Sequence, residues 1–87
     1  MEKSIYSQKY VTFLGLLTEF RKAARLTQGN VAQNLGIGTT QSFVSKCERG
    51  ERRIDIVELR EFCIALSVPF DQFISELESR LLVASHV

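Results

Sequence analysis

Residues 28–50 decide the fold, and they read QGNVAQNLGIGTTQSFVSKCERG. The stretch predicts two short helices joined by a turn that contains two glycines. Thr27 precedes the first helix and can cap it, because its hydroxyl accepts hydrogen bonds from the early free N–H groups. An apolar stripe follows, made of Val31, Ala32 and Leu35. Gly36 suits the left-handed backbone conformation that ends such a helix.

The second helix of this stretch has two unlike faces. Thr40 is its expected cap, and Val44 and Cys47 form the side that we expect to be buried. The opposite face is polar and almost free of acidic groups, and it carries Gln41, Ser42, Ser45, Lys46 and Arg49. Hydrogen-bonding side chains without carboxylates are what a helix needs to read base edges in the major groove of DNA.

These residues resemble the helix-turn-helix of the phage repressor and Cro type, also called the Xre-like family. The resemblance covers residues 20–74 and rests on LTQ at 26–28, LG at 35–36, QSFVSKCERGERR at 41–53 and DIVEL at 55–59. It implies an all-α fold, a compact five-helix bundle of the lambda-repressor-like DNA-binding type, with the helix-turn-helix formed by helices 2 and 3. The turn at residues 37–40 is longer than is usual in the family, which leaves the angle between the two motif helices open.

The resemblance also implies which side chains contact bases. The implied base-contacting residues are Gln41, Ser42 and Lys46, with Ser45 beside them on the same face. A glutamine can pair with adenine through two hydrogen bonds, and a lysine can reach the acceptors of guanine. We therefore expect the helix to bind double-stranded DNA with sequence preference.

Phosphate contacts are implied at the ends of the motif. Gln28, at the amino end of the first motif helix, matches the phosphate-binding glutamine of the family, where the helix dipole also favours an anion. Thr40, Arg52 and Arg53 are further phosphate candidates. Each has a simpler interpretation, since Thr40 can serve only as a cap and the two arginines can serve only as solvated loop residues.

Before the motif, the sequence predicts a long helix over residues 7–25. Its apolar stripe consists of Tyr10, Phe13, Leu14, Leu17, Phe20 and Ala24. Its last two turns hold Arg21, Lys22 and Arg25, positive charges that are favourable against the helix dipole. In the family, a basic residue at the position of Arg21 pairs with the acid at the position of Glu48. We expect this ion pair here, in a structural role that ties the first helix to the recognition helix.

After the motif, two further helices are predicted. Asp55 and Glu58 have the spacing of a capping box at the start of the first of these, whose buried stripe is Leu59, Phe62, Cys63 and Leu66. Ser67 ends it where the family commonly has glycine. The last helix should span residues 69–84 with Pro69 in its first turn. We expect its inner side to close the core with Phe70, Phe73, Ile74 and Leu77.

Apolar residues continue beyond that core at Leu81, Leu82 and Val83. On a monomer they would form an exposed apolar patch, a feature that usually marks an interface. We therefore expect a two-fold homodimer through the last helix, bound to a near-palindromic operator. The alternative is a tail whose leucines fold back on the first helix.

Composition agrees with a DNA-binding protein once the charge is divided along the chain. Residues 1–53 hold nine Lys and Arg against four Glu, a net charge of +5, whereas residues 54–87 carry −4. A basic front and an acidic back orient a molecule towards phosphates without a high overall charge. We expect one domain over residues 1–87, located in the cytoplasm, because no membrane-length apolar run and no signal peptide is visible. Cys47 and Cys63 should be buried, reduced and structural, and the alternative is a disulfide or a redox switch.

Other function classes find little support in the sequence. The single histidine, His86, provides neither a catalytic triad nor a metal cluster, and no phosphate-binding glycine loop is present. We expect no catalytic activity, no cofactor, no metal, no membrane contact and no small-molecule ligand. The second hypothesis is a protein-interaction module, such as an antitoxin-type domain whose main task is to bind a partner protein. The first is a sequence-specific transcriptional regulator.

Overall fold

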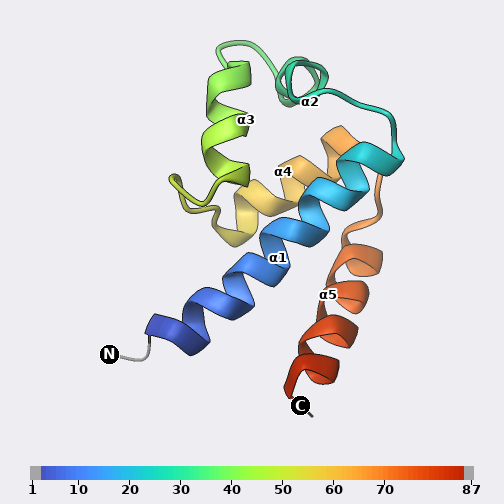
Figure 1. Ribbon diagram of the computed structural model, residues 1–87. Helices are drawn as coiled ribbons and strands as arrows, with labels where there is room; N and C mark the ends of the chain where they lie inside the picture. The colour runs from blue at the N-terminus through green and yellow to red at the C-terminus, as the bar shows by residue number, and fades with distance from the viewer. Residues whose placement is uncertain (1–2, 86–87) are drawn as a thin grey trace.

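A computed structural model describes the backbone of residues 3–85 and the side chains of residues 8–83, so His86 lies outside the described residues. Five helices form: α1 Lys3–Ala23, α2 Gln28–Leu35, α3 Gln41–Glu48, α4 Ile56–Leu66 and α5 Phe70–Ser85 (Figure 1). Within residues 3–85 no strand occurs. The predicted all-α, five-helix fold is thereby confirmed. None of these helices is both long and apolar enough to cross a membrane.

The predicted helix starts are confirmed by their caps. The side chain of Thr40 accepts a hydrogen bond from the N–H of Phe43, as its position before α3 predicts. Asp55 and Glu58 form the predicted capping box of α4, since each side chain accepts a hydrogen bond from the other's backbone N–H. These caps fix where α3 and α4 begin.

Two helices end in a way that the sequence prediction missed in part. α1 stops at Ala23, because Arg25 turns into the left-handed conformation with φ 60°. The N–H of Leu26 then bonds to the carbonyl of Arg21, at 3.1 Å, which is the pairing of a Schellman motif. Arg25 is thus not in the last turn of the helix, and Ala24, predicted to be buried, is exposed. Ser67 adopts the same conformation after α4, where the family commonly has glycine.

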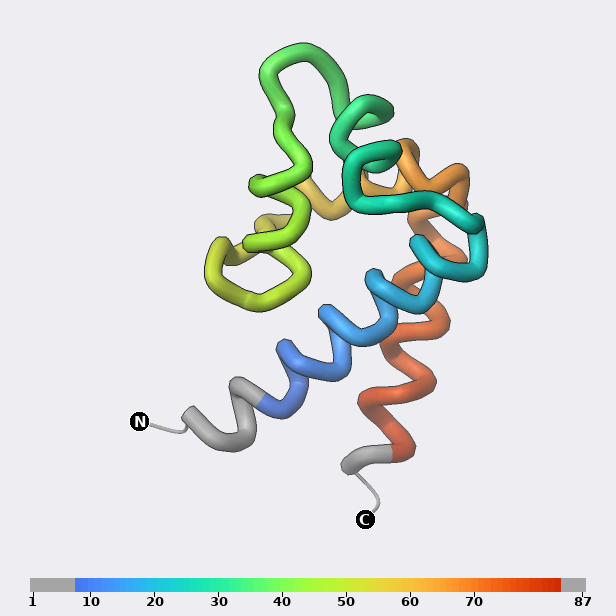
Figure 2. The backbone as a smooth tube through the Cα atoms, turned by 45° about the horizontal axis from the view of Figure 1, so that its top comes forward, coloured from blue at the N-terminus to red at the C-terminus, as the bar shows by residue number. Residues whose placement is uncertain are grey.

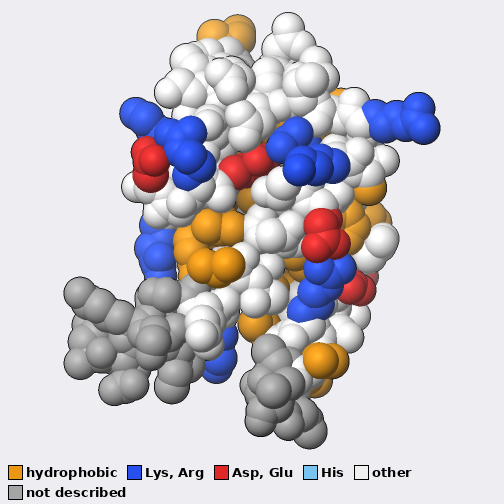
Figure 3. Space-filling model, viewed as in Figure 1, with side chains coloured by type: hydrophobic (Ala, Val, Ile, Leu, Met, Phe, Trp, Pro, Cys, Tyr) orange, Lys and Arg blue, Asp and Glu red, His pale blue; other side chains and the backbone are white. Residues whose placement is uncertain are grey.

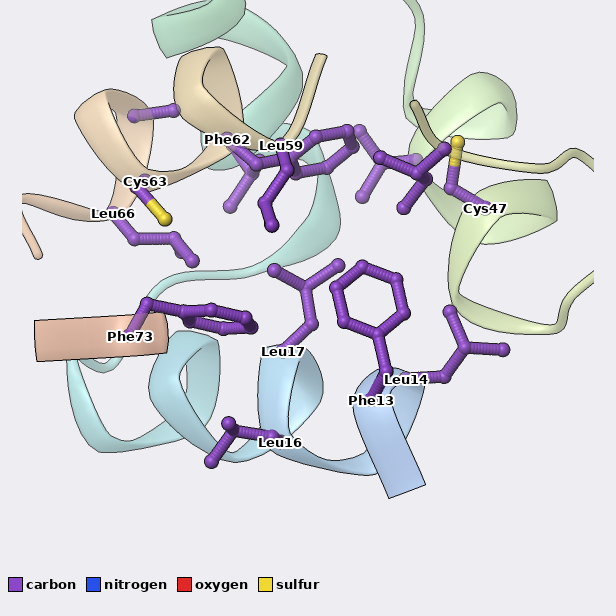
Figure 4. Close-up of a cluster of buried hydrophobic side chains, with 14 of the residues drawn as sticks. Phe13, Leu14, Leu16, Leu17, Cys47, Leu59, Phe62, Cys63, Leu66 and Phe73 are labelled. Atoms are coloured by element: carbon purple, nitrogen blue, oxygen red, sulfur yellow. The ribbon is translucent and has the colours of Figure 1, made fainter. Parts of the chain in front are cut away.

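The core is assembled from all five helices. Its buried members are Phe13, Leu14, Leu16, Leu17, Val31, Ala32, Val44, Cys47, Ile54, Leu59, Phe62, Cys63, Ala65, Leu66 and Phe73. Figure 4 shows Phe73 of α5 and Leu17 and Phe13 of α1 on the opposite side of the core from Leu59 and Phe62 of α4. Phe73 packs edge-on against Phe13, with ring centroids 6.0 Å apart. This packing fixes α1, and through it the motif, against the rest of the bundle.

Two predictions about this core were wrong. Leu16, left out of the predicted stripe, is 1% exposed, because α1 packs against α5 as well as against α3. Ile74, expected to close the core, is 37% exposed. Its neighbour Phe73 occupies the centre, and the next residue of a helix points about 100° away from it.

The start of α5 also differs from the prediction. Pro69 lies just before α5 instead of in its first turn.

Both cysteines are free and buried, as predicted. Burial raises the pKa of the Cys63 thiol to about 11 and also raises the pKa of Cys47. The thiols are therefore protonated at neutral pH and pack as small apolar side chains.

Candidate nucleic-acid interface

The two motif helices present the face that the sequence predicts. Val44 and Cys47 are fully buried, so the opposite side of α3 faces solvent. Gln41, Ser42, Lys46 and Arg49 are exposed there, and Ser45 is half-buried. Gln41, the first residue of α3, lies beside Gln28, the first residue of α2. The four predicted base-contacting residues therefore share one side of α3.

A chain of hydrogen bonds runs from this face back to α1. The Gln41 amide donates to Oε1 of Gln28 at 2.8 Å, and the Gln28 amide donates to Oε1 of Glu48 at 2.9 Å. Glu48 in turn receives two hydrogen bonds from Arg21, at 2.7 and 3.1 Å. The ion pair predicted between Arg21 and Glu48 is confirmed, and both side chains are largely buried. We call these four residues the anchoring network.

The anchoring network decides what Gln28 and Gln41 have left for DNA. A glutamine amide has two N–H donors and one oxygen acceptor. Gln41 uses one donor on Gln28, which leaves the donor and the acceptor that a two-hydrogen-bond pair with adenine requires. Gln28 uses its oxygen and one donor within the protein, so a single N–H remains for a phosphate.

Neighbouring polar groups on α3 are partly engaged as well. The Ser45 hydroxyl oxygen accepts a hydrogen bond from Arg49, whose guanidinium also pairs with Glu51 at 2.8 Å. The Thr40 hydroxyl oxygen accepts the capping bond, which leaves its O–H as a donor. Lys46 lies one turn after Ser42 on α3 and is exposed to solvent.

The two predicted phosphate-binding arginines lie in different surroundings. Arg52 makes a two-hydrogen-bond pair with Glu58, both at 2.7 Å, and its guanidinium lies 5.2 Å from the ring centre of Phe43. The hydrogen bond from Arg52 holds the pKa of the Glu58 carboxyl below its usual range. The guanidinium of Arg53 instead lies 4.2 Å above the ring of Tyr10, on α1. The charge of Arg52 is therefore paired with a carboxylate, which weakens its attraction for a phosphate.

Two further basic residues lie near the site, and the sequence analysis did not assign them to it. Lys22 and Arg25 were interpreted only as favourable charges at the end of the first helix. The structure places both on an open depression of about 680 Å³, which is lined by Arg21, Lys22, Arg25, Leu26, Thr27, Gln28, Gly29 and Gln41. Their position directly before the motif in the sequence was the signal that could have identified them.

Seen from one side, positive charge flanks the motif and does not cover its tip. In Figure 3, lysine and arginine side chains lie over α3 and over the end of α1, while the end formed by α2 and the turn before α3 shows no charged side chain. The sequence agrees, since residues 26–45 contain no Asp, Glu, Lys or Arg. The flanks can attract phosphates while the centre remains neutral.

Comparison with known proteins agrees with this geometry. Residues 13–73 match the model of a helix-turn-helix domain family. A protein described as an uncharacterized transcriptional regulator in the ATPase CF(0) region of Rhodospirillum rubrum is 40% identical over 58 residues, covering 67% of this chain and 52% of that protein. The chain thus spans about half the length of this curated relative.

A solved structure shows the same fold in a related chain. It is an XRE-family like protein from Pseudomonas syringae pv. tomato str. DC3000, 40% identical in sequence, with a TM-score of 0.81. The match covers 92% of this chain and 98% of that one. The chain belongs to the Xre-like family of helix-turn-helix DNA-binding regulators.

Proposed function

We propose that the chain is a sequence-specific transcriptional regulator that inserts α3 into the major groove of double-stranded DNA. The observation that carries the proposal is the exposed, acid-poor face of α3 together with the anchoring network behind it. A base-reading side chain discriminates only if its position is fixed before it meets the base. Gln41 is fixed in this way through Gln28 and Glu48.

In this proposal the side chains fall into two groups. Gln41, Ser42, Ser45 and Lys46 contact bases, and Gln28, Thr40, Arg52 and Arg53 contact phosphates. Lys22 and Arg25 join the second group, because they lie on the depression that Gln28 and Gln41 also line. Base contacts specify the sequence, whereas phosphate contacts position the protein on the duplex.

We further propose a two-fold homodimer through α5 on a near-palindromic operator. Leu82 is 51% exposed and Val83 is 67% exposed, and Ile74 adds to the apolar surface of the same helix. Leu81 is half-buried beside them. One short recognition helix contacts few base pairs, and a second copy doubles the sequence that is read. The two recognition helices would then lie about 34 Å apart.

A protein-interaction module is less well supported. An interface helix presents aromatic or aliphatic anchors. The single aromatic residue of α3, Phe43, is half-buried and stacks on Phe62, with ring centroids 6.3 Å apart. The exposed face of α3 therefore offers hydrogen bonds and not an apolar anchor.

Selection of bound duplexes from a random pool tests the proposed function. We expect one enriched near-palindrome, bound with an affinity that falls steeply as salt is raised. Enrichment of no sequence, or binding unaffected by salt, would contradict DNA recognition by α3. Sedimentation of the intact chain and of the Leu81→Glu/Leu82→Glu variant tests the dimer separately. An intact chain that is monomeric both alone and on its operator would overturn the dimer.

A further inference from the structure

The turn between α2 and α3 carries an isoleucine that no other part of the described protein covers. Ile37 has a relative exposure of 108%, the highest among the large apolar residues that are exposed. An apolar side chain so fully in water is normally found singly and without consequence. Its position, three residues before the cap of the recognition helix, gives it a different significance.

The backbone of this turn is built to hold Ile37 outward. Gly36 ends α2 with φ 121° and ψ 179°, so its φ is positive as expected but the residue is not in the left-handed helical region. That combination is essentially restricted to glycine. Gly38 has φ 89°, and the N–H of Thr39 closes the turn on the carbonyl of Gly36 at 3.2 Å. The turn is therefore hydrogen-bonded, with Ile37 at its tip.

The surroundings of Ile37 suit a contact with base edges. The segment from 26 to 45 is uncharged, so the tip neither repels phosphates nor binds them as a lysine would. Figure 3 shows this end of the molecule without charged side chains. Gln41 lies four positions after Ile37 in the chain, so their Cα atoms lie at most about 14 Å apart. At a rise of about 3.4 Å per base pair, this separation of the Cα atoms corresponds to about four base pairs, so both side chains can belong to one site.

We propose that Ile37 is a further base-contacting residue, which packs against the 5-methyl group of a thymine at the edge of the major-groove site. The thymine methyl is the apolar group that base pairs display in this groove. The proposal rests on the insertion of α3 proposed above. It predicts a preference for thymine over cytosine at one position on the side of the site next to the turn.

The experiment removes the methyl group from the DNA and the side chain from the protein in turn. Deoxyuridine replaces each thymine of the selected duplex, and wild-type protein is compared with Ile37→Ala. We expect one replacement to weaken wild-type binding about fourfold, the value for one buried methyl group. Ile37→Ala should bind the original duplex no more tightly than wild type binds the deoxyuridine duplex. The affinity of Ile37→Ala should not change when that thymine is replaced.

The matched control is Val57→Ala, which truncates another exposed apolar residue, on α4 and away from the turn. It should leave every affinity unchanged. An Ile37→Ala variant that binds as tightly as wild type overturns the proposal. A loss that is equal on thymine and deoxyuridine duplexes overturns it too, and would place Ile37 against the sugar–phosphate backbone.

The outcome separates this inference from the proposed function. If Gln41→Ala loses discrimination at one base pair while Ile37→Ala behaves as wild type, α3 reads DNA and the turn does not. If no duplex is selected at all, both proposals fail. Thermal unfolding of Ile37→Ala should match wild type, because the side chain makes no buried contact.

Discussion

Two regions of the molecule are each joined to α1 by an arginine–glutamate ion pair, and the two pairs differ in how far they are buried. Behind the motif, Arg21 on α1 makes two hydrogen bonds to Glu48 on α3, and their side chains are 12% and 8% exposed. Two residues earlier on α1, Glu19 receives two hydrogen bonds from Arg80 on α5, at 2.8 and 3.0 Å, and these side chains are 60% and 36% exposed. Figures 1 and 2 show that α5 runs away from the motif.

The difference in burial shows which pair the fold depends on. An exposed ion pair gains little, because water solvates both charges almost as well. A buried pair has lost that water, so either charge left alone is costly. Glu48 also accepts a hydrogen bond from the Gln28 amide, and Gln28 accepts one from Gln41. The position of Glu48 therefore determines the position of Gln41, a proposed base-contacting residue. The motif thus depends on a buried ion pair, and loss of either partner disturbs the whole anchoring network. The attachment of α5 does not depend on its exposed ion pair in this way.

Arg21→Met should give the largest effect, a loss of about 3–5 kcal/mol in the free energy of unfolding, because it strands a buried carboxylate. Urea unfolding measures this loss. The double variant Arg21→Met/Glu48→Leu serves as control and should be less destabilised than the single one. A single variant as stable as wild type would show that Glu48 remains hydrated, and the contrast with Arg80 would disappear.

Gln41→Ala and Lys46→Ala should each weaken binding to the selected duplex by about 1–3 kcal/mol and relax discrimination at particular base pairs. Because Gln28 positions Gln41, Gln28→Ala should lower affinity on all sequences and also reduce discrimination at the base pair that Gln41 contacts. A double-mutant cycle between the two should show coupling of about 0.5–3 kcal/mol, as for residues in contact. Strictly additive losses would mean that the network does not orient the reader.

Glu58→Gln should increase affinity for DNA, since it frees Arg52 for a phosphate while the amide oxygen still caps the N–H of Asp55. The dependence of binding on salt should steepen by about one unit for the added contact. Equilibrium binding at several salt concentrations measures both. The control is Glu61→Gln, an exposed acid on the same helix. No change in slope would show that Arg52 remains in the loop when DNA is bound.

Arg80→Met should give the smallest effect, leaving the urea midpoint near the wild-type value at neutral pH. The hydrogen bond from Arg80 holds the pKa of Glu19 below its usual range. A lowered folded-state pKa contributes stability above the unfolded pKa, and this contribution is lost as the pH falls through the folded value. The difference between variant and wild type should therefore shrink in acid. A large loss at neutral pH would make the two ion pairs of α1 alike in strength.

Much of this structure could be predicted from local signals in the sequence. Capping residues and apolar spacing identified α2, α3 and α4, because both signals act within a few residues. The ion pair of Arg21 with Glu48 was implied by family resemblance. What could not be predicted depends on neighbours distant in the chain. Leu16 is buried because α5 returns beside α1, and Ile74 is exposed because Phe73 fills the available space.

The candidate site shows the same division. The polar face of α3 follows from helical spacing, so its residues could be named in advance. The hydrogen-bond partners could not be named, because Gln28 meets Gln41 and Glu48 only after α2 packs against α3. Lys22 and Arg25 were assigned to a helix end for the same reason, since only the fold places them beside Gln28.

The position of Tyr10 has an optical consequence. The chain has no tryptophan and two tyrosines, so its ultraviolet fluorescence is tyrosine emission. The Tyr10 hydroxyl oxygen accepts a hydrogen bond from the backbone N–H of Ile54 at 3.0 Å, and the guanidinium of Arg53 covers one face of its ring. If Arg53 leaves the ring for a phosphate, the emission of Tyr10 changes with it. The unmodified protein would then carry its own reporter of duplex binding, placed beside the loop that follows the recognition helix.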